Sequence, residues 1–455
     1  MTAPRSRAFV LPGAAAPWPG TVASPRHRES GAFRAFGWLV AIYTALLLSK
    51  LNEMFPLVGR MQPSKIVGAL LLVGAFLVMR ERSVITVLRS SPARWVGVFV
   101  ALALLSVPGA VWPGGSVEFL THEFWKTLVF FVIAATAWCD RGTLWRSVVT
   151  LVASTAVVAV ALVVGDAQAM QGRVYVGTSL DPNESALRLL VVIPFALYLA
   201  SQGRYWSLVG GASALVMVAG VVQTGSRGAF LGLVVMGVWL LHRARGRWRW
   251  LSLAAVVGGT VVVALTVRGV ARERLSTVLH LGQDYNVTYQ EGRLPIWKRG
   301  LGYMADHPLL GVGVYDFPVA EGVLSEKRRQ TTRGVKYSDA HNIFVQVGAE
   351  LGVIGLLAFA GMLWTAAGGC RRVRRLARLA QSANAPLAKA EASLATAALG
   401  AMVGLVVGGF FLSVAYDPVV FFVTAICIAV RLGSPLGPPA APAVIAPRRA
   451  GQGRW

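Results

Sequence analysis

Long uninterrupted apolar blocks are the feature that most constrains this chain. They run for roughly 15–22 residues each, the length at which an α-helix crosses a hydrocarbon layer of ~30 Å. Twelve such blocks lie at approximately 36–51, 66–79, 95–111, 124–138, 148–165, 186–201, 207–222, 228–241, 251–267, 342–366, 393–414 and 418–431. Only 14% of the residues are charged and the mean hydropathy is +0.60, whereas a soluble domain carries about 25% charged residues. The sequence therefore predicts an all-α polytopic membrane protein with about twelve transmembrane helices.

The net charge of +24 raises the question of a nucleic-acid partner, which the placement of the charges answers. If the N-terminus is cytoplasmic, the arginines concentrate in the segments between spans on the cytoplasmic side. The acidic residues that share this side are Glu29, Glu81, Asp140 and Glu391. This asymmetry is the positive-inside rule. The basic charge therefore orients the helices, and we expect no nucleic-acid partner.

The same pattern predicts how the chain is divided. Both ends are rich in Pro, Ala and Arg, a composition that cannot bury a core. The predicted parts are a disordered cytoplasmic tail over 1–35, transmembrane helices 1–9 over 36–267, a periplasmic loop with short amphipathic helices over 268–341, transmembrane helices 10–12 over 342–431, and a second disordered cytoplasmic tail over 432–455. Cys139, Cys370 and Cys427 have the spacing of neither a disulfide framework nor a metal site, so we expect no metal ion.

The long outer loop, 268–341, breaks the charge rule because it contains eleven Lys and Arg residues. Long loops cross the membrane largely regardless of their charge, so a solvated basic loop is one interpretation. A site for an anionic substrate is the other. Polar residues within and around this loop bear on the choice.

Residues 295–306 predict a short amphipathic helix on or near the membrane surface. Pro295 suits the first helical position, where its missing N–H costs nothing. The expected apolar face consists of Trp297, Leu301 and Met304. Arg293 would stand just ahead of the helix, where free backbone N–H groups also attract anions. Arg293 is thus a candidate phosphate ligand, with an ordinary surface arginine as the alternative.

Two further candidates lie at predicted helix ends on the outer side. Arg227 lies in the very short glycine-flanked turn between spans seven and eight, where it either serves a function or extends to the interface. His341 lies at the start of span ten. With Ser338 or Asp339 as the N-cap, His341 would be in the first helical turn, where the helix dipole favours the neutral imidazole that a general base requires. The alternative is a polar interfacial histidine.

A fourth polar group precedes span six. Asp181 is expected to be the N-cap of that span, with Glu184 completing a capping box. Glu184 and Arg188 are spaced for an i,i+4 ion pair. These carboxylates therefore have a structural explanation, and Arg173 in the preceding outer segment is the stronger candidate for a ligand contact.

Several of these segments, taken in order, resemble a known family. They are TGSRG at 224–228, GRLPIW at 292–297, DHPLLGVG at 306–313 and AHNIFVQVGAELGVIGLL at 340–357, preceded by a GR…DPNE segment. This order and spacing, over roughly 165–365, resemble the O-antigen ligase/polymerase superfamily of bacterial membrane glycosyltransferases. The region 106–125 departs from the first outer loop of the ligases, which leaves the acceptor open.

The resemblance implies a GT-C-type glycosyltransferase of the bacterial inner membrane, with cytoplasmic termini and a periplasmic active site. Such an enzyme moves a glycan from a polyprenyl (undecaprenyl) diphosphate carrier to an acceptor hydroxyl, with inversion and without a metal ion or other cofactor. By similarity, Arg227 and Arg293 would bind the diphosphate and His341 would activate the acceptor. Possible additional contacts are Arg173, Asp181 and Asn183.

Three functions remain open. The DPNE motif and the atypical first outer loop favour a Wzy-type polymerase, which joins repeat units on the carrier. The alternative within the superfamily is a ligase that attaches polymer to lipid A–core. A chain-length regulator and a flippase are possible partners. The alternative from another class is a secondary transporter, but transporters place polar sites near the membrane midplane, and here the polar groups concentrate at one face.

Overall fold

The computed structural model describes residues 31–55, 59–164, 168–170, 173–175, 181–243, 250, 253, 258, 292–328, 337–380 and 385–436. Its elements are α1 (Gly31–Ser49), η1 (Leu51–Met54), α3 (Pro63–Val78), α4 (Glu81–Leu88), α5 (Ser91–Ser106), η2 (Val107–Gly109), α6 (Pro113–Phe119), the π-helix η3 (Leu120–Phe124), α7 (Trp125–Ala137), α8 (Arg141–Val164), β1 (Gln168–Met170), β2 (Arg173–Tyr175), α9 (Pro182–Ala200), α10 (Arg204–Gln223), α11 (Arg227–Arg243), α15 (Arg293–Asp306), α16 (Phe317–Arg328), α17 (Ile343–Leu379), α18 (Ala385–Gly409) and α19 (Pro418–Leu432).

The described chain is helical, as predicted, apart from the short antiparallel hairpin of β1 and β2, in which Ala169 pairs with Val174. Eight helices are long and apolar enough to cross a membrane, or nine if α3 and α4, which meet at a 107° bend, form one span. With the two shorter apolar helices α11 and α19, every predicted block except 251–267 coincides with an apolar helix. That block lies almost entirely outside the described residues, so the count of twelve stays a prediction, as does the GT-C-type architecture.

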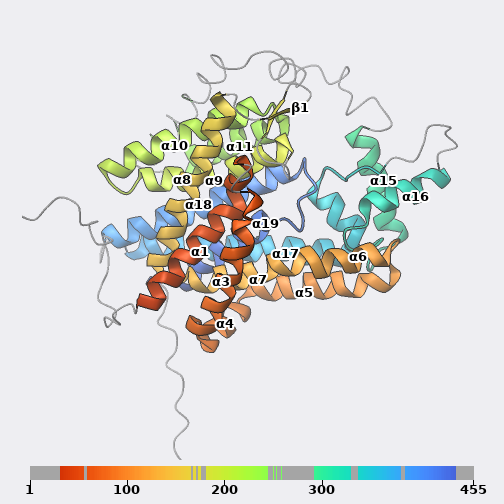
Figure 1. Cartoon of the computed structure of the whole chain (residues 1–455), viewed down its shortest axis with the longest axis horizontal. Helices are drawn as coiled ribbons and strands as arrows, with labels where there is room; N and C mark the ends of the chain where they lie inside the picture. Colours follow the sequence, from red (N-terminus) through yellow and green to blue (C-terminus); the bar gives the residue numbers. More distant parts are fainter. Residues whose placement is uncertain are drawn as a thin grey trace, which may run out of the picture.

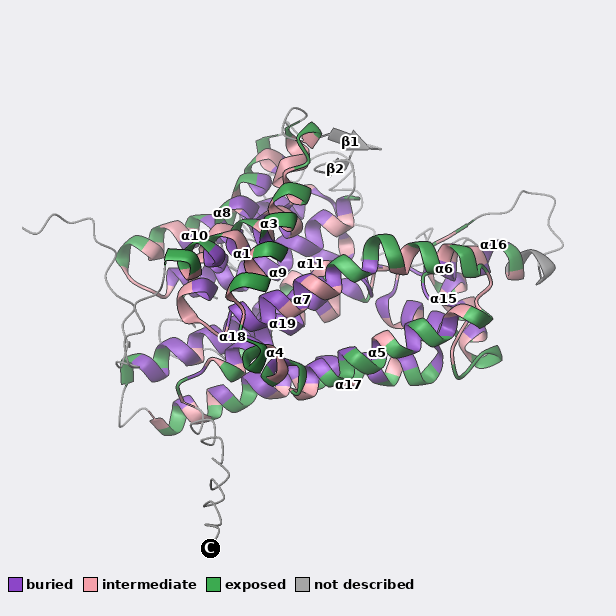
Figure 2. Cartoon of the chain, turned by 60° about the horizontal axis from the view of Figure 1, so that its bottom comes forward, coloured by how far each residue is buried: buried purple, intermediate pink, exposed green. Residues whose placement is uncertain are grey.

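Helix α9 forms the centre of the bundle. In its most apolar window 89% of the residues are buried, against 39% in α1 and in α5, and Figure 2 shows the contrast between the central and peripheral helices. Large apolar side chains on the periphery, such as Phe76 and Leu77, are exposed in the isolated chain. A membrane supplies hydrocarbon contacts to such faces, so the hydrophobic exterior fits a membrane protein.

A glycine stripe on α18 allows this helix to approach α9 closely. The stripe consists of Gly400, Gly404 and Gly408. A Cβ atom on Gly408 would lie 2.7 Å from Leu187 Cδ1, and one on Gly404 would lie 3.2 Å from Leu190 Cγ. Small residues spaced four apart let the backbones of two membrane helices approach closely. In lipid no hydrophobic force drives helices together, so their association depends on this close packing.

Helix α17 is broken at Gly352, where φ is 70°. The backbone groups released by the break are bonded by the loop 308–313. Val353 N donates to Pro308 O over 2.8 Å, and Val312 N donates to Ala349 O over 2.9 Å. The loop that joins α15 to α16 therefore crosses α17 at this break. The break also separates a short segment, 343–351, from the long remainder of α17.

Helices α15 and α16 lie at one end of the molecule, beside α6 and the first turns of α17 (Figure 1). This end is called the α15 end below. A small second core holds it together, formed by Ile296, Tyr303, Val312, Phe317, Ala320, Ala340 and Ala349. Arg299 on α15 pairs with Glu321 on α16 over 2.7 Å, and Tyr303 donates to the same carboxylate. The amphipathic segment is thus fixed to the bundle.

Candidate active site at the α15 end

The connection between α18 and α19, residues 410–417, is the structural centre of the candidate site. The sequence placed its first half inside a span, but α18 ends at Gly409. Helix α19 begins at Pro418, with Asp417 as its N-cap, where Asp417 Oδ1 accepts a hydrogen bond from Val419 N. The connection contacts residues of α9, α11 and α15 and the segment that leads into α17, as the next paragraphs describe.

Arg227 lies where the sequence predicted, in a tight turn between two helices. Helix α10 ends at Gln223, Arg227 is the first residue of α11, and Gly225 has a φ of 61°. The next residue, Gly228, packs directly on the connection, because a Cβ atom there would lie 2.7 Å from Phe411 Cβ. The start of α11, and with it Arg227, is therefore fixed against Phe411.

Arg293 contacts the same aromatic ring. Its guanidinium carbon lies 5.9 Å from the centre of the Phe411 ring, a separation at which a cation is attracted to a π-system. The predicted position of Arg293 ahead of the helix is wrong, because Gly292 is the N-cap and Arg293 the first helical residue, with Pro295 the third. Arg293 still lies at the helix N-terminus, where backbone N–H groups remain unpaired.

The predicted apolar face of α15 is also wrong, by one position. The buried residues are Ile296, Gly300 and Tyr303. The side chain of Leu301 is 50% exposed. The register is set by packing, since a Cβ atom on Gly300 would lie 2.5 Å from Val345 Cγ1 of α17. Trp297 instead faces the connection, where its ring meets that of Phe410 edge-on at 5.3 Å.

His341 reaches the connection through its backbone. His341 N donates to Ser413 Oγ over 2.8 Å, and its φ is 45°, in the left-handed region. Helix α17 begins at Ile343, three or four residues later than expected, because Asn342 is the N-cap and its Oδ1 accepts from Phe344 N. The prediction of Ser338 or Asp339 as the cap, with His341 in the first turn, is therefore wrong. His341 stands just ahead of the positive helix terminus.

Asp181 has the capping role that the sequence indicated. Its Oδ1 accepts from the backbone N–H groups of Asn183 and Glu184, each over 2.7 Å, and its Oδ2 accepts from Asn183 Nδ2. The predicted ion pair between Glu184 and Arg188 is not present among the described contacts. Arg188 Nη2 instead pairs with Asp417 Oδ2 over 2.8 Å, which connects the central helix to the connection. Arg173 lies in β2, and its side chain falls outside the described residues.

The loop before α16 closes the other side of this end. Asp316 Oδ2 accepts from Trp112 N over 2.7 Å, and Ser116 donates to Val314 O. Burial raises the pKa of Asp316, an effect that the Trp112 and Ser116 hydrogen bonds oppose. Phe317 N donates to Glu350 Oε1, so a carboxyl group of α17 caps the start of α16. The loop 311–316 is thus held from both sides.

The connection brings three predicted residues to one place, although they are 48 to 114 positions apart along the chain. Arg227 is held through Gly228 on Phe411, Arg293 stacks on Phe411, and His341 is held by Ser413. The sequence reasoning missed the connection itself. The pair Asp417–Pro418, an N-cap followed by proline at the first helical position, repeats the pattern of Asp181–Pro182 and was the available signal.

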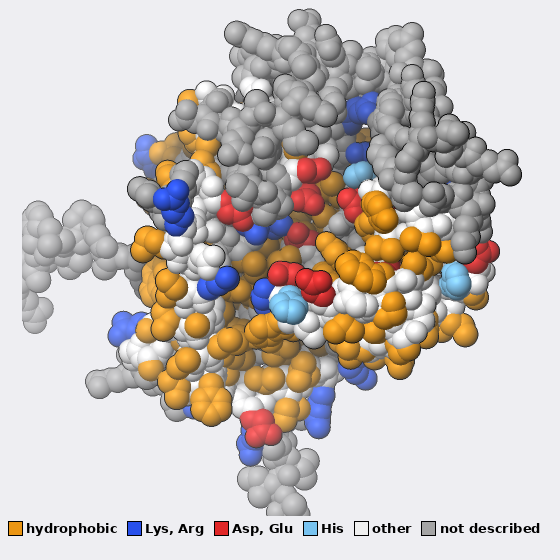
Figure 3. All heavy atoms as spheres, turned by 45° about the vertical axis from the view of Figure 1, so that its right-hand side comes forward, with side chains coloured by type: hydrophobic (Ala, Val, Ile, Leu, Met, Phe, Trp, Pro, Cys, Tyr) orange, Lys and Arg blue, Asp and Glu red, His pale blue; other side chains and the backbone are white. Residues whose placement is uncertain are grey.

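Charged side chains gather near the middle of the face that Figure 3 presents, with hydrophobic side chains around them. Within the described part of the chain, no group of three or more His, Cys, Asp or Glu residues is arranged to hold a metal ion. The three candidate residues contribute two guanidinium groups and one imidazole group. Guanidinium groups bind phosphate oxygens and stay charged at every physiological pH.

Two comparisons with known proteins bear on this arrangement. Residues 212–360 match the family described as O-antigen ligase (Wzy_C). The match contains Arg227, Arg293 and His341. The chain is also 27% identical over 207 residues to the exopolysaccharide production protein ExoQ of Rhizobium meliloti (strain 1021), covering 42% of this chain and 46% of that protein. The chain thus spans less than half the length of this relative.

Proposed function

Because the chain belongs to the O-antigen ligase/polymerase superfamily, we propose that it transfers a glycan from an undecaprenyl diphosphate carrier to an acceptor hydroxyl. The reaction takes place at the periplasmic face of the inner membrane, during O-antigen or exopolysaccharide assembly. The observation that carries the proposal is the shared contact of Arg227's turn, Arg293 and His341 with residues 410–413. Two cations and a base are the groups that such a transfer requires.

In the proposed reaction the acceptor oxygen attacks the anomeric carbon as the bond to the diphosphate breaks. Negative charge grows on the departing diphosphate. Arg227 and Arg293 stabilise this charge, because fixed guanidinium groups aimed at a developing anion lower the barrier. The neutral His341 imidazole takes the proton from the attacking hydroxyl. Attack from the side opposite the leaving group gives inversion at the anomeric carbon.

The polymerase form of this reaction is our first proposal, because the DPNE motif and the atypical first outer loop favour it. The ligase is the second candidate, supported by the description of the matching family. The two differ in the acceptor, which is a lipid-linked repeat unit for a polymerase and lipid A–core for a ligase. Purified enzyme given only lipid-linked repeat units should produce a ladder of longer chains if it is a polymerase. A product that appears only after lipid A–core is added would identify a ligase.

The catalytic role of His341 is tested by substitution in the purified enzyme. His341→Ala should lower the transfer rate by roughly 10²–10⁴-fold, the contribution typical of a general base. The matched control is His307→Ala, because His307 is an exposed histidine at the end of α15. It should keep the unsubstituted rate. Turnover is measured with synthetic undecaprenyl diphosphate oligosaccharide in detergent. A His341→Ala enzyme as fast as the control would refute the role.

The diphosphate role is tested separately by binding of inorganic pyrophosphate. Arg227→Lys and Arg293→Lys keep the charge but lose the planar, bidentate donors. Each should weaken pyrophosphate binding, measured by calorimetry, while the melting temperature stays unchanged. Equal affinity in both variants and the unsubstituted enzyme would contradict this assignment.

A further inference from the structure

Arg188 is a buried guanidinium group with spare hydrogen-bond donors. Only 6% of the residue is exposed. Its Nη2 pairs with Asp417 Oδ2 over 2.8 Å, but Nε and Nη1 have no hydrogen-bond partner among the described residues. Buried charged donors without acceptors are costly. A ligand that supplies oxygen acceptors would remove this cost.

The charges around Arg188 decide which ligand suits it. Glu184 lies one helical turn earlier on α9 and interacts electrostatically with both Arg188 and Asp417. Two carboxyl groups therefore accompany one guanidinium group. An anionic ligand such as phosphate would be repelled by the additional carboxyl group. A hydroxyl group fits better, because it accepts from a guanidinium and donates to a carboxylate.

Tyr315 places an aromatic ring near the same acids. Its ring lies parallel to that of Phe119, with the two centres 4.1 Å apart and the planes at 4°. Even so, 54% of Tyr315 is exposed, so part of the ring stays open on the side that Phe119 does not cover. Partial burial and the nearby carboxyl groups of Asp339, Glu350, Glu184 and Glu123 raise the pKa of Tyr315. The Phe119 ring also meets that of Tyr416 edge-on, with the two centres 5.3 Å apart, and Tyr416 directly precedes Asp417, the partner of Arg188.

The backbone conformation of Tyr315 is also unusual. Its φ is 64°, a conformation that costs energy for any residue other than glycine. The fixed loop 311–316 holds the residue in this conformation. The exposed ring is thereby held in a fixed orientation.

We propose that Arg188, Glu184 and Tyr315 form a subsite for a neutral, hydroxyl-bearing sugar ring of the glycan, beside His341. Hydroxyl groups of the sugar accept from Arg188 Nε and Nη1 and donate to Glu184. The apolar C–H face of the sugar packs on the Tyr315 ring. This inference rests on the proposed function, since it assigns part of the same substrate. It separates sugar recognition here from diphosphate recognition at Arg227 and Arg293.

Two variants test the subsite without depending on one another. Arg188→Lys keeps the charge opposite Asp417 but removes the Nε and Nη1 donors. Tyr315→Ala removes the exposed ring. The control is Tyr205→Ala, because Tyr205 is 69% exposed and lies at the start of α10. The probes are lipid-free oligosaccharide released from the surface glycan of the producing bacterium, followed by saturation-transfer NMR, and inorganic pyrophosphate, followed by calorimetry.

We expect Arg188→Lys to bind the oligosaccharide roughly tenfold more weakly, the loss that one hydrogen bond to a charged group implies. Tyr315→Ala should also bind it more weakly, because the aromatic packing surface is lost. They should bind pyrophosphate normally, and Tyr205→Ala should bind both normally. In turnover assays, the substrate whose KM rises, lipid-linked donor or acceptor, identifies which of the two the subsite holds. Normal oligosaccharide binding in both variants would overturn the subsite. Loss of pyrophosphate binding in Arg188→Lys would assign Arg188 to the phosphate and also overturn it.

The outcomes distinguish this inference from the proposed function. If the unsubstituted enzyme binds oligosaccharide through Arg188 and Tyr315 but neither binds pyrophosphate nor turns over lipid-linked donor, the sugar subsite stands and the transferase proposal fails. If it binds pyrophosphate and turns over donor while both variants remain normal, the transferase proposal stands and the subsite fails.

Discussion

Ser413 contributes one hydroxyl group to the candidate site, and this group binds the backbone of His341. Its Oγ accepts the backbone N–H of His341, a residue in the left-handed region of backbone conformation. Left-handed backbone persists at a residue with a side chain only where the surroundings hold it. Ser413 is therefore a positioning residue for His341.

Replacement of Ser413 by Ala should slow transfer by roughly tenfold or more, since small misplacements of a catalytic group are costly. Ser413→Thr retains the hydroxyl group and should recover much of the rate. The melting temperature should fall only slightly, as expected for the loss of one hydrogen bond worth about 0.5–1.5 kcal/mol. Initial rates with lipid-linked oligosaccharide give the measurement. A fully active Ser413→Ala enzyme would show that His341 keeps its position without this bond.

At the scale of elements, the break in α17 is sensitive to a single added carbon. A Cβ atom on Gly352 would lie 2.4 Å from Pro308 O, at a φ of 70°. Backbone atoms cannot move aside as a flexible side chain can. The loop that crosses the break would therefore be displaced.

Gly352→Ala should destabilise the protein by at least about 1–3 kcal/mol, the cost of a strained backbone conformation. Gly368→Ala is the matched control on the same helix, because nothing lies within 4 Å of its added Cβ atom. Thermal unfolding in one detergent compares the two. Equal melting temperatures would mean that the helix break tolerates a side chain.

The sequence predicted the elements better than their ends. Apolar runs and the Asp181 cap could be recognised, because span length and N-cap chemistry are local properties. The register of α15 could not be predicted from the sequence. Its buried residues, Ile296, Gly300 and Tyr303, are covered by α17 and α16, which are distant along the chain. The partner of Arg188 was missed for the same reason. Asp417 is 229 residues away, whereas Glu184 lies one turn along the same helix.

The candidate residues Arg227, Arg293 and His341 could be named from their motifs. What held them together could not be predicted, because Phe411 and Ser413 belong to a segment that hydropathy assigned to a span.

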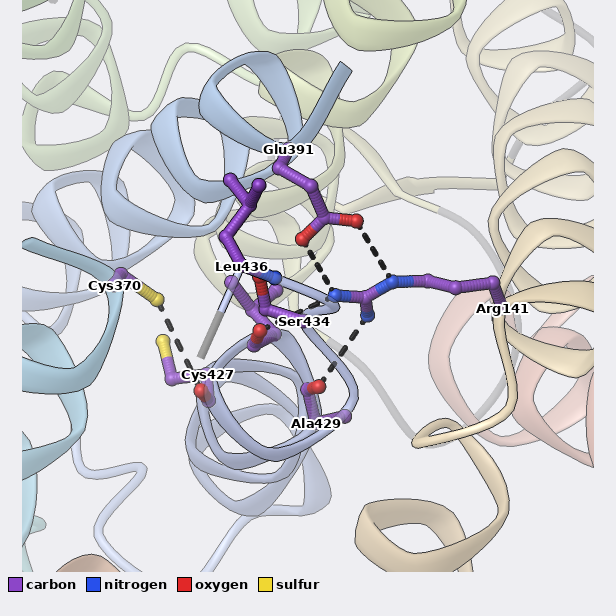
Figure 4. Close-up of polar contacts among 8 residues, drawn as sticks. Arg141, Cys370, Glu391, Cys427, Ala429, Ser434 and Leu436 are labelled. Atoms are coloured by element: carbon purple, nitrogen blue, oxygen red, sulfur yellow. Dashed lines mark hydrogen bonds and ion pairs between the residues drawn. The ribbon is translucent and has the colours of Figure 1, made fainter. Parts of the chain in front are cut away.

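At the scale of the whole molecule, a buried ion pair ties the bundle together at the other end of α19. Arg141 Nη2 lies 2.7 Å from Glu391 Oε2 of α18, whose side chain is only 1% exposed. Arg141 also donates to the carbonyl oxygens of Ala429 and Val430 near the end of α19. Figure 4 shows the guanidinium group between the carboxylate and the Ala429 carbonyl. Three helices therefore meet at one side chain.

Arg141→Leu should destabilise the protein by about 3–5 kcal/mol, because Glu391 would be left as an unpaired buried charge. Adding Glu391→Leu should recover much of this loss. The control is Lys126→Leu, since Lys126 pairs with Glu123 at the surface, where the two side chains are 48% and 70% exposed, and such pairs contribute little. Thermal unfolding of the four proteins provides the comparison. Loss of stability in the double variant as large as in Arg141→Leu would contradict this account.

The position of the α18–α19 connection near the C-terminal end of the described chain has a consequence for biogenesis. A chain synthesised only as far as α17 already carries Arg227, Arg293 and His341, yet it lacks Phe411 and Ser413, which hold them. The arrangement of these three residues is therefore completed only after α18 and the connection have been synthesised. A nascent chain that is still being inserted would lack this arrangement until the α18–α19 hairpin enters the bundle.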